Sequence, residues 1–510
     1  MTPRRPGRSV LRGPAAPSGR RPARPLVARP PGAPPSEVPH YNYGWLIYVG
    51  GALLTVLLAV AIHRLHYDYG QAPHRILKIL AGLGVFLVVL LRPPVALHAW
   101  LLAIPLGEWL PATGIPGVNG PNLLFLALVA SWVLPRAFKR ERIGSPARIA
   151  WPLTAYIAVL VLSLVRAWVA PPGGGTYPGD VMLRSVWQSA VGLAVYFVVA
   201  NTVANKEQAR NLLVSFGVGV SIAGLIALRE FLRRGPDARV AGAIGDINDL
   251  GAYFALCVSV LAGLAFASGA FRGWKRLVVW AAAALAFIGV AFPKSRGGFV
   301  GAAAGLGLGT YLTNRRAIVI FVIVLAASPL WAPGFVKDRV AETTVTESLE
   351  SAAWEDQYAG IDPNVAVRFE IWKVALAATL RSPIIGYGYA SVPYLTGRVL
   401  DRPYSAHSLY VETAAQSGIV GLVVLFWLIK ACVGSGRELL SLSPRGAPRG
   451  LAVGFLSGTV ALLLACVFGQ RLTHVTIAGT YFFLAGLVDR SIALERAEAL
   501  PAGAETEHAS

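Results

Sequence analysis

The chain has 510 residues, of which 55% are hydrophobic and 14% are charged, whereas an average soluble domain carries about 25% charged residues. Apolar runs such as 44–62, 277–292 and 422–433 approach the roughly 20 residues that cross a bilayer. The formal net charge of +20 does not make nucleic acid the expected partner, because Lys and Arg accumulate on the cytoplasmic side of membrane proteins. The three cysteines show no disulfide framework and no CxxC metal pattern. We therefore predict an all-α polytopic membrane protein.

Residues 1–40 differ from the rest of the chain. They are rich in proline, hold eight arginines and one acidic residue, and contain no apolar core. Such a segment cannot bury enough apolar surface to fold alone, so we predict a disordered, basic cytoplasmic tail that contacts anionic membrane lipid. It is not a signal peptide by this reading, because no separate apolar region with a cleavage site precedes the first span.

The apolar runs predict about twelve to fourteen transmembrane helices. The expected spans are 44–62, 76–91, 94–109, 121–135, 149–169, 184–203, 210–229, 250–268, 277–292, 298–312, 317–332, 409–430, 450–468 and 475–488. Basic connections such as 136–142 and 271–276 fall on one side, which the positive-inside rule assigns to the cytoplasm together with both termini. The predicted parts are the tail 1–40, a first bundle 41–332, a periplasmic loop with interfacial helices 333–408, a last bundle 409–490 and a cytoplasmic tail 491–510.

Connections expected on the outer side also carry cations, against this rule. They include Lys294 and Arg296 in the turn 293–298, and Arg339 and Arg368 in the loop 333–406. Cations in these places predict that an anion is handled at the outer face. For the long loop, the alternative is that long loops translocate regardless of charge. The span interiors are otherwise nearly free of ionisable residues and no internal repeat is evident, which disfavours a transporter.

The segment PYSAHSLYVETAAQSGIVG (403–421) begins a predicted apolar helix with polar residues. Pro403 disfavours helix before it, and Ser405 or Ser408 can cap the helix that follows. His407 then lies at the positive end of that helix, which disfavours the imidazolium form and keeps the ring able to accept a proton. A neutral histidine is what a general base requires. The alternative is an interfacial histidine that only anchors the helix.

Further along the same helix, Glu412 is costly in lipid unless it is paired, so we expect Ser408 or a loop cation as its partner. Gly418 and Gly421 are three residues apart, which predicts that they share one helix face and permit close helix packing.

Three other segments are expected at the same face. In SRGGF (295–299), the glycines permit close approach to a ligand and the Arg296 guanidinium suits a phosphate. The segment 365–392 predicts a helix on the membrane surface, with Trp372 at the interface and GYGY as a flexible connector towards His407. In GDINDLGAYF (245–254), the Asp and Asn residues predict helix capping, with a metal site as the alternative.

Together these residues resemble the O-antigen ligase and Wzy-polymerase superfamily of bacterial envelope glycosyltransferases. The family pattern is met by His407-Ser408, nine residues, Gly418, two residues and Gly421. SRGG at 295–298, an Arg-x3-Trp helix before SPIIGYGY, and Asp-x-Asn-Asp at 246–249 also match, and the resemblance covers roughly 210–430. The family's Arg-x3-Leu appears here as Arg296-x3-Val or Arg368-x3-Trp, which leaves open which arginine takes which role.

The resemblance implies a GT-C-like helical bundle in the bacterial inner membrane with an active site facing the periplasm. The donor would be a glycan on undecaprenyl diphosphate and the acceptor a hydroxyl of lipid A-core or of a growing polysaccharide. Transfer would invert the anomeric carbon without a metal or cofactor. His407 would be the base, with Glu412 orienting it. The expected diphosphate ligands are Arg296, Arg368, Lys294 and Arg339.

The reading from the residues agrees with this chemistry, because outward cations can stabilise a diphosphate leaving group. Ligation and repeat-unit polymerisation would use the same parts, and the loop 333–406 would set the acceptor. A transporter of lipid-linked glycan and a scaffold for an envelope assembly are the alternatives from other classes.

Overall fold

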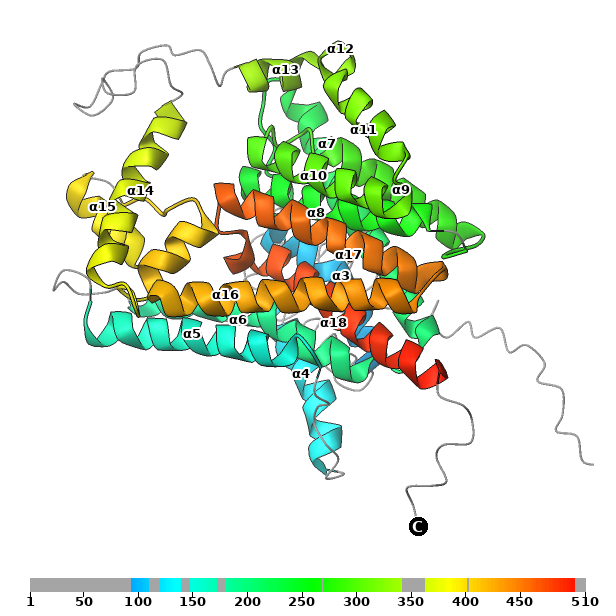
Figure 1. Ribbon diagram of the computed structural model, residues 1–510, viewed down its shortest axis with the longest axis horizontal. Helices are drawn as coiled ribbons and strands as arrows, with labels where there is room; N and C mark the ends of the chain where they lie inside the picture. The colour runs from blue at the N-terminus through cyan, green and yellow to red at the C-terminus, as the bar shows by residue number, and fades with distance from the viewer. Residues whose placement is uncertain are drawn as a thin grey trace, which may run out of the picture. The chain divides into compact units, whose positions relative to one another are not determined.

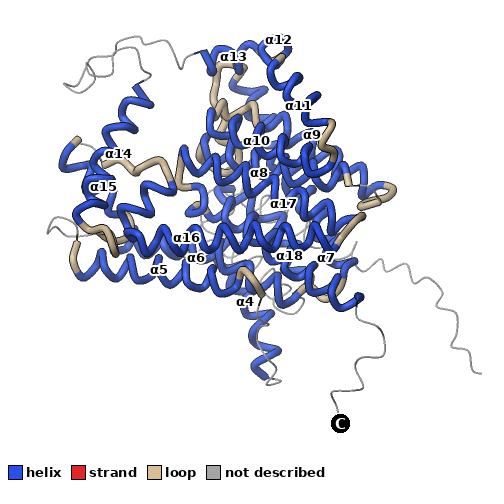
Figure 2. Tube along the Cα trace, in the orientation of Figure 1, coloured by secondary structure: helices blue, strands red, loops and turns tan. Residues whose placement is uncertain are grey.

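The computed structural model describes residues 93–109, 120–138, 147–171, 179–267, 269–341, 363–400 and 403–499. The chain divides into two units, Met1–Tyr43 and Gly44–Ser510, and all described residues belong to the second. The predicted tail 1–40 and the spans 44–62 and 76–91 lie outside the described residues. Within the described ranges the regular structure is helical and there is no strand (Figure 2).

The protein is an all-α polytopic membrane protein. Six of its described helices are long and apolar enough to cross a bilayer: α5 (Ala150–Val169), α7 (Lys206–Arg234), α8 (Ile247–Phe266), α16 (Leu409–Leu442), α17 (Gly446–Ala465) with η3 (Cys466–Phe468), and α18 (Val475–Ala499). The others are α3 (Pro93–Ala103), η1 (Ile104–Trp109), α4 (Gly120–Phe138), α6 (Gly179–Thr202), α9 (Trp274–Gly289), α10 (Arg296–Thr313), α11 (Ala317–Ala326), α12 (Ser328–Trp331), α13 (Gly334–Ala341), α14 (Pro363–Arg381), α15 (Ser391–Val399) and η4 (Arg471–Thr473).

Helix α8 lies at the centre of the described bundle, where it packs against α9, α10 and α17 (Figure 1). Small residues bring these backbones together, since a side chain at Gly263 would overlap Gly454 and one at Gly301 would approach the Ala461 carbonyl. This close packing is typical of helices that associate in lipid. Helix α5 instead exposes large apolar residues, including Trp151, Leu162 and Trp168, as expected for a surface that faces hydrocarbon.

Several helix boundaries differ from the sequence predictions. Helix α16 continues to Leu442 and α18 to Ala499, into the predicted C-terminal tail. The predicted span 317–332 is two helices, α11 and α12, and the ten residues of α11 extend only about 15 Å. Pro329, in the first turn of α12, explains this break, because its ring favours a new helix start over continuation of the preceding one.

Helix α16 is interrupted near its start by a segment that we call the strap, residues 382–390. Gly418 has non-helical angles (φ 63°, ψ −155°). The strap fills the break: Tyr387 N–H donates to the Ala415 carbonyl at 2.9 Å. In return, Ile419 N–H donates to the Pro383 carbonyl at 2.8 Å. The backbone groups freed by the break are thereby satisfied, as a membrane environment requires.

The hydrogen bonds of the strap show that two sequence predictions, for Gly418 and for GYGY, were wrong. Gly418 does not serve as a packing position on a regular helix face. It has a positive φ, and a Cβ there would overlap the Ile384 carbonyl group. The GYGY sequence is also not a flexible connector, because Gly388 N–H donates to the Gln416 carbonyl and Tyr389 N–H to the Ser163 carbonyl, both at 2.9 Å.

Candidate functional site

A cavity of about 480 Å³ lies at one end of the described bundle, where α8 and α16 begin and where α17 connects to α18. Polar and titratable side chains from these segments and from α6 and the strap line it. They are Gln188, Asp246, Asn248, Asp249, Tyr389, Ser405, His407, Glu412, Gln416, Gln470, Arg471, Thr473, His474 and Thr476. The other lining residues are small or apolar and include Gly107 and Pro393.

His407 enters this cavity from a strained loop directly before α16. Its φ of 46° lies in the left-handed region, which costs a non-glycine residue about 1 kcal/mol or more, although histidine is among the residues found there more often. Ser408 occupies the N-cap position, but its side chain makes no capping hydrogen bond, unlike the sequence prediction. No hydrogen bond joins the His407 ring to another residue in the described ranges, so the ring is not committed to a structural partner.

The residue before the histidine is held from both sides. Ala406 N–H donates to Glu412 Oε2 at 2.7 Å, and the Ala406 carbonyl accepts the indole N–H of Trp372 at 2.8 Å. Ala406 is also buried in a small apolar cluster with Ile371 of α14 and Val392 of α15. These contacts fix the loop backbone at the point where the His407 side chain leaves it.

Glu412 is buried and its partners differ from those expected. Oε1 accepts from the Gln416 side chain at 2.6 Å and Oε2 from Ala406 N–H. Neither Ser408 nor a loop cation pairs with this carboxylate among the described contacts. The contacts with backbone and amide donors place Glu412 behind the His407 loop rather than against the imidazole ring. Its link to the histidine is the hydrogen bond from the N–H of the neighbouring residue, Ala406.

The surroundings of His407 lower the pKa of its imidazole. Burial is the largest cause, followed by the positive charges of Arg368 and Arg471, while Asp246 acts in the opposite direction. Burial and nearby cations both disfavour imidazolium. The neutral form is therefore favoured at neutral pH, which is the form that can accept a proton.

Arg471, which the sequence analysis did not consider, is the most deeply placed cation of the cavity. Its guanidinium pairs with Asp249 Oδ1 at 2.5 Å and donates to the Phe468 carbonyl at 3.2 Å. Gly469 permits this placement, because a Cβ there would overlap the guanidinium. Only 10% of the Arg471 side chain is exposed. Arg471 lies in the short connection between the predicted spans 450–468 and 475–488. Arg296 was selected because it is a cation in a short outer turn, and the same criterion would have selected Arg471.

The start of α8 meets the SRGG turn beside the cavity. Asp246 caps α8 by accepting from Asn248 N–H and Asp249 N–H, at 2.8 and 2.9 Å, which confirms the capping prediction. Ser295 caps α10 and its hydroxyl donates to Asn248 Oδ1 at 3.3 Å. The predicted segments 245–254 and 295–299 thus lie together with the His407 loop and the strap.

The four predicted diphosphate ligands take different positions. Arg296 is half-buried at the first position of α10, next to the Ser295 cap. Arg368 is half-buried on α14 and close enough to His407 to affect its pKa. Lys294 donates to the Asp237 carbonyl at 3.1 Å and lies over the Phe335 ring, away from the cavity lining. Arg339 is part of α13, and its side chain lies outside what the structure describes.

Part of this region matches a known protein family. Residues 281–426 match the family model described as O-antigen ligase. The matched segment contains Arg296, the strap, His407 and the Gly418 break. It contains neither Asp249 nor Arg471, so the cavity combines residues from inside and outside the match. No curated protein matches the sequence.

Proposed function

We propose that this chain, whose segment 281–426 matches the family model described as O-antigen ligase, is an inverting, metal-independent glycosyltransferase. It moves a glycan from undecaprenyl diphosphate to an acceptor hydroxyl at the periplasmic face of the bacterial inner membrane. The observation that supports this most directly is the cavity in which an uncommitted, neutral histidine faces a buried arginine.

In this reaction His407 is the general base. The acceptor oxygen attacks the anomeric carbon while its proton passes to the imidazole, and the bond from that carbon to the diphosphate oxygen breaks. Attack opposite the leaving group inverts the configuration. A pKa below the ordinary histidine value suits this role, because the ring is then unprotonated when the acceptor arrives.

The cations stabilise the diphosphate that leaves. Arg471 lines the cavity with His407, and Arg368 acts on the same imidazole. A guanidinium offers paired donors that match phosphate oxygens, and its charge is worth more in a poorly hydrated cavity than in water. Arg296 is the third candidate, through its position beside the capped start of α8. We assign Glu412 a positioning role behind the histidine.

The acceptor is a lipid A-core hydroxyl in this proposal. A repeat-unit polymerase is the second candidate within the same chemistry, since it needs the same base and the same cations. The family description of the matched segment favours the ligase. The α14–α15 region, which packs on the start of α16, is the part that we expect to select the acceptor.

Reconstitution into proteoliposomes tests the proposal. Undecaprenyl-diphosphate glycan is supplied with either lipid A-core or a second lipid-linked glycan as acceptor, with and without EDTA. We expect transfer to lipid A-core that persists in EDTA and is lost in His407→Ala. Loss of activity with EDTA alone would contradict the metal-independent mechanism. Substrate movement that continues in His407→Ala, without transfer, would instead support a transporter.

A further inference from the structure

A second pocket, of about 300 Å³, lies at the end of α8 opposite the cavity, between the last turn of α8 and the first turns of α9. The twenty residues of α8 separate the two sites by about 30 Å, which is the thickness of the hydrocarbon core. Because α8 is long and apolar enough to cross a bilayer, we place the pocket at the membrane boundary opposite the cavity. Nothing in the proposed glycan transfer requires it.

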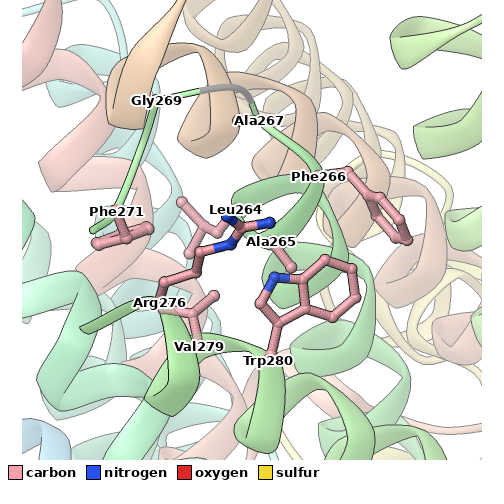
Figure 3. Close-up of a pocket in the computed structure, with 9 residues that line it drawn as sticks. All are labelled: Leu264, Ala265, Phe266, Ala267, Gly269, Phe271, Arg276, Val279 and Trp280. Carbon is pink, nitrogen blue, oxygen red and sulfur yellow. The ribbon is translucent and has the colours of Figure 1, made fainter. Parts of the chain in front are cut away.

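The pocket has apolar walls and a single cationic residue. Leu264 and Phe266 of α8 and Val279 and Trp280 of α9 line it, and Figure 3 shows the Arg276 guanidinium among these side chains. The Phe266 and Trp280 rings pack edge to face at 4.9 Å. Both remain partly exposed, at 64% and 37%, so the walls present apolar surface that the protein itself does not cover.

Arg276 has no ion pair or hydrogen bond from its side chain within the described residues. Arg272 and Lys275 lie beside it in sequence, and the first turn of α9 contains no acidic residue. Lys275 is turned to the Asn211 side chain, to which it donates at 2.9 Å. Arg210 adds positive charge near Lys275, and the Glu207 carboxylate offsets only part of it, so the surroundings keep a positive charge that favours an anionic ligand.

We propose that this pocket binds an anionic phospholipid of the adjoining leaflet. Its phosphate contacts the Arg276 guanidinium and one acyl chain lies against Phe266 and Trp280. A soluble anion would leave the aromatic walls uncovered, and a neutral lipid would leave the Arg276 guanidinium in the pocket without an anionic partner. Basic pockets between membrane helices are known to hold anionic lipid headgroups, and a guanidinium binds phosphate through paired donors.

Native mass spectrometry of the full chain tests this. The protein is released from vesicles of equal phosphatidylglycerol and phosphatidylcholine, and the lipid retained per protein is counted. The wild type should retain phosphatidylglycerol selectively. Arg276→Gln should lower this retention by about tenfold or more, the effect of losing one charge-assisted hydrogen bond. Arg316→Gln is the matched control, because Arg316 is an exposed arginine at the start of another helix, α11, and is not among the residues that line the pocket.

A second variant tests the apolar half of the site. Phe266→Ala removes a largely exposed ring, so the fold should persist, and it should weaken retention of long-chain phosphatidylglycerol more than that of a dihexanoyl analogue. Equal retention in wild type and Arg276→Gln would overturn the proposal. Equal retention of phosphatidylglycerol and phosphatidylcholine by the wild type would also overturn it. That result is expected if Arg276 is present only because basic residues accumulate on one side of the membrane.

Discussion

At the scale of single residues, the candidate site depends on how one backbone position is held. Ala406 has its N–H committed to Glu412 and its carbonyl to Trp372. The next residue, His407, takes a left-handed conformation that the chain would not choose on its own. The strain is therefore maintained by a buried carboxylate and an indole that come from two different helices.

Exchanging Glu412 separates its charge from its hydrogen bonding. Glu412→Ala leaves Ala406 N–H buried without an acceptor, which costs about 1–3 kcal/mol, and should reduce kcat strongly while the KM for the donor changes little. Glu412→Gln keeps an acceptor oxygen and should restore most of kcat. Steady-state transfer in proteoliposomes measures both values. Equal loss in the two variants would contradict a positioning role and would indicate that the negative charge itself is required.

Two substitutions should shift the acid limb of the pH profile in opposite directions. Arg471 lowers the pKa of His407 and Asp246 raises it. In the proposed mechanism activity requires the unprotonated ring, so it is lost as pH falls through this pKa. Arg471→Gln should therefore move the loss of activity to higher pH. Asp246→Asn should move it to lower pH, while the asparagine still caps α8. Normalised rate-pH profiles separate these shifts from changes in maximal rate.

At the scale of elements, the strap and the break in α16 form one unit. The break exposes carbonyls and N–H groups that lipid cannot satisfy, and the strap satisfies them. Because α14 and α15 are joined by the strap and pack on the same helix, this region is fastened to α16 at Gly418, beside the cavity that Tyr389 and Pro393 line. In Figure 1 this region lies where α16 begins, with α5 running beside it.

Gly418→Ala should therefore damage more than the local helix. The side chain would occupy a positive φ and overlap the Ile384 carbonyl group, so we expect a loss of about 1–3 kcal/mol and nearly complete loss of transfer. Thermal unfolding in detergent and the transfer assay measure the two effects. Gly434→Ala in the same helix is the control, because its Cβ would meet only the flexible Arg148 side chain. An unchanged Gly418→Ala protein would show that the break is not needed.

The local sequence predicted the helices of the described region better than their interruptions. Apolar runs indicate helices because their composition is a local property, and the Asp246 cap was predicted for the same reason. The Gly418 break depends on hydrogen bonds to the strap, about thirty residues earlier in the chain, and no local pattern encodes it. The partners of Glu412 were mispredicted because the fold of the loop brings Ala406 N–H back over the helix.

At the scale of the whole described molecule, the cavity is assembled from distant parts of the chain. The matched segment 281–426 supplies His407 and the strap, α8 supplies Asp249, and the connection between α17 and α18 supplies Arg471. The Arg471–Asp249 ion pair joins the last two of these parts and is nearly buried. Arg471 lies beyond the resemblance to the family, which ends near residue 430, so only the rule on cations in short outer connections could have predicted it.

A double-mutant cycle separates the structural and chemical roles of this ion pair. Removing either partner leaves a buried charge unpaired, so Arg471→Gln and Asp249→Asn should each destabilise the protein by about 3–5 kcal/mol. The double variant should recover much of this stability. It should not raise transfer above the residual rate of Arg471→Gln, because the proposed phosphate ligand is absent. Recovered transfer in the double variant would contradict the proposed role of Arg471.

The strap also gives a meaning to the nine residues between Ser408 and Gly418. The break anchors one end of this helical stretch, and His407 lies just beyond the other end. One inserted residue would turn the histidine by about 100° around the helix axis and raise it by about 1.5 Å. The nine residues make about two and a half helical turns, so the length of this sequence motif sets the direction in which the His407 side chain points relative to the Gly418 break.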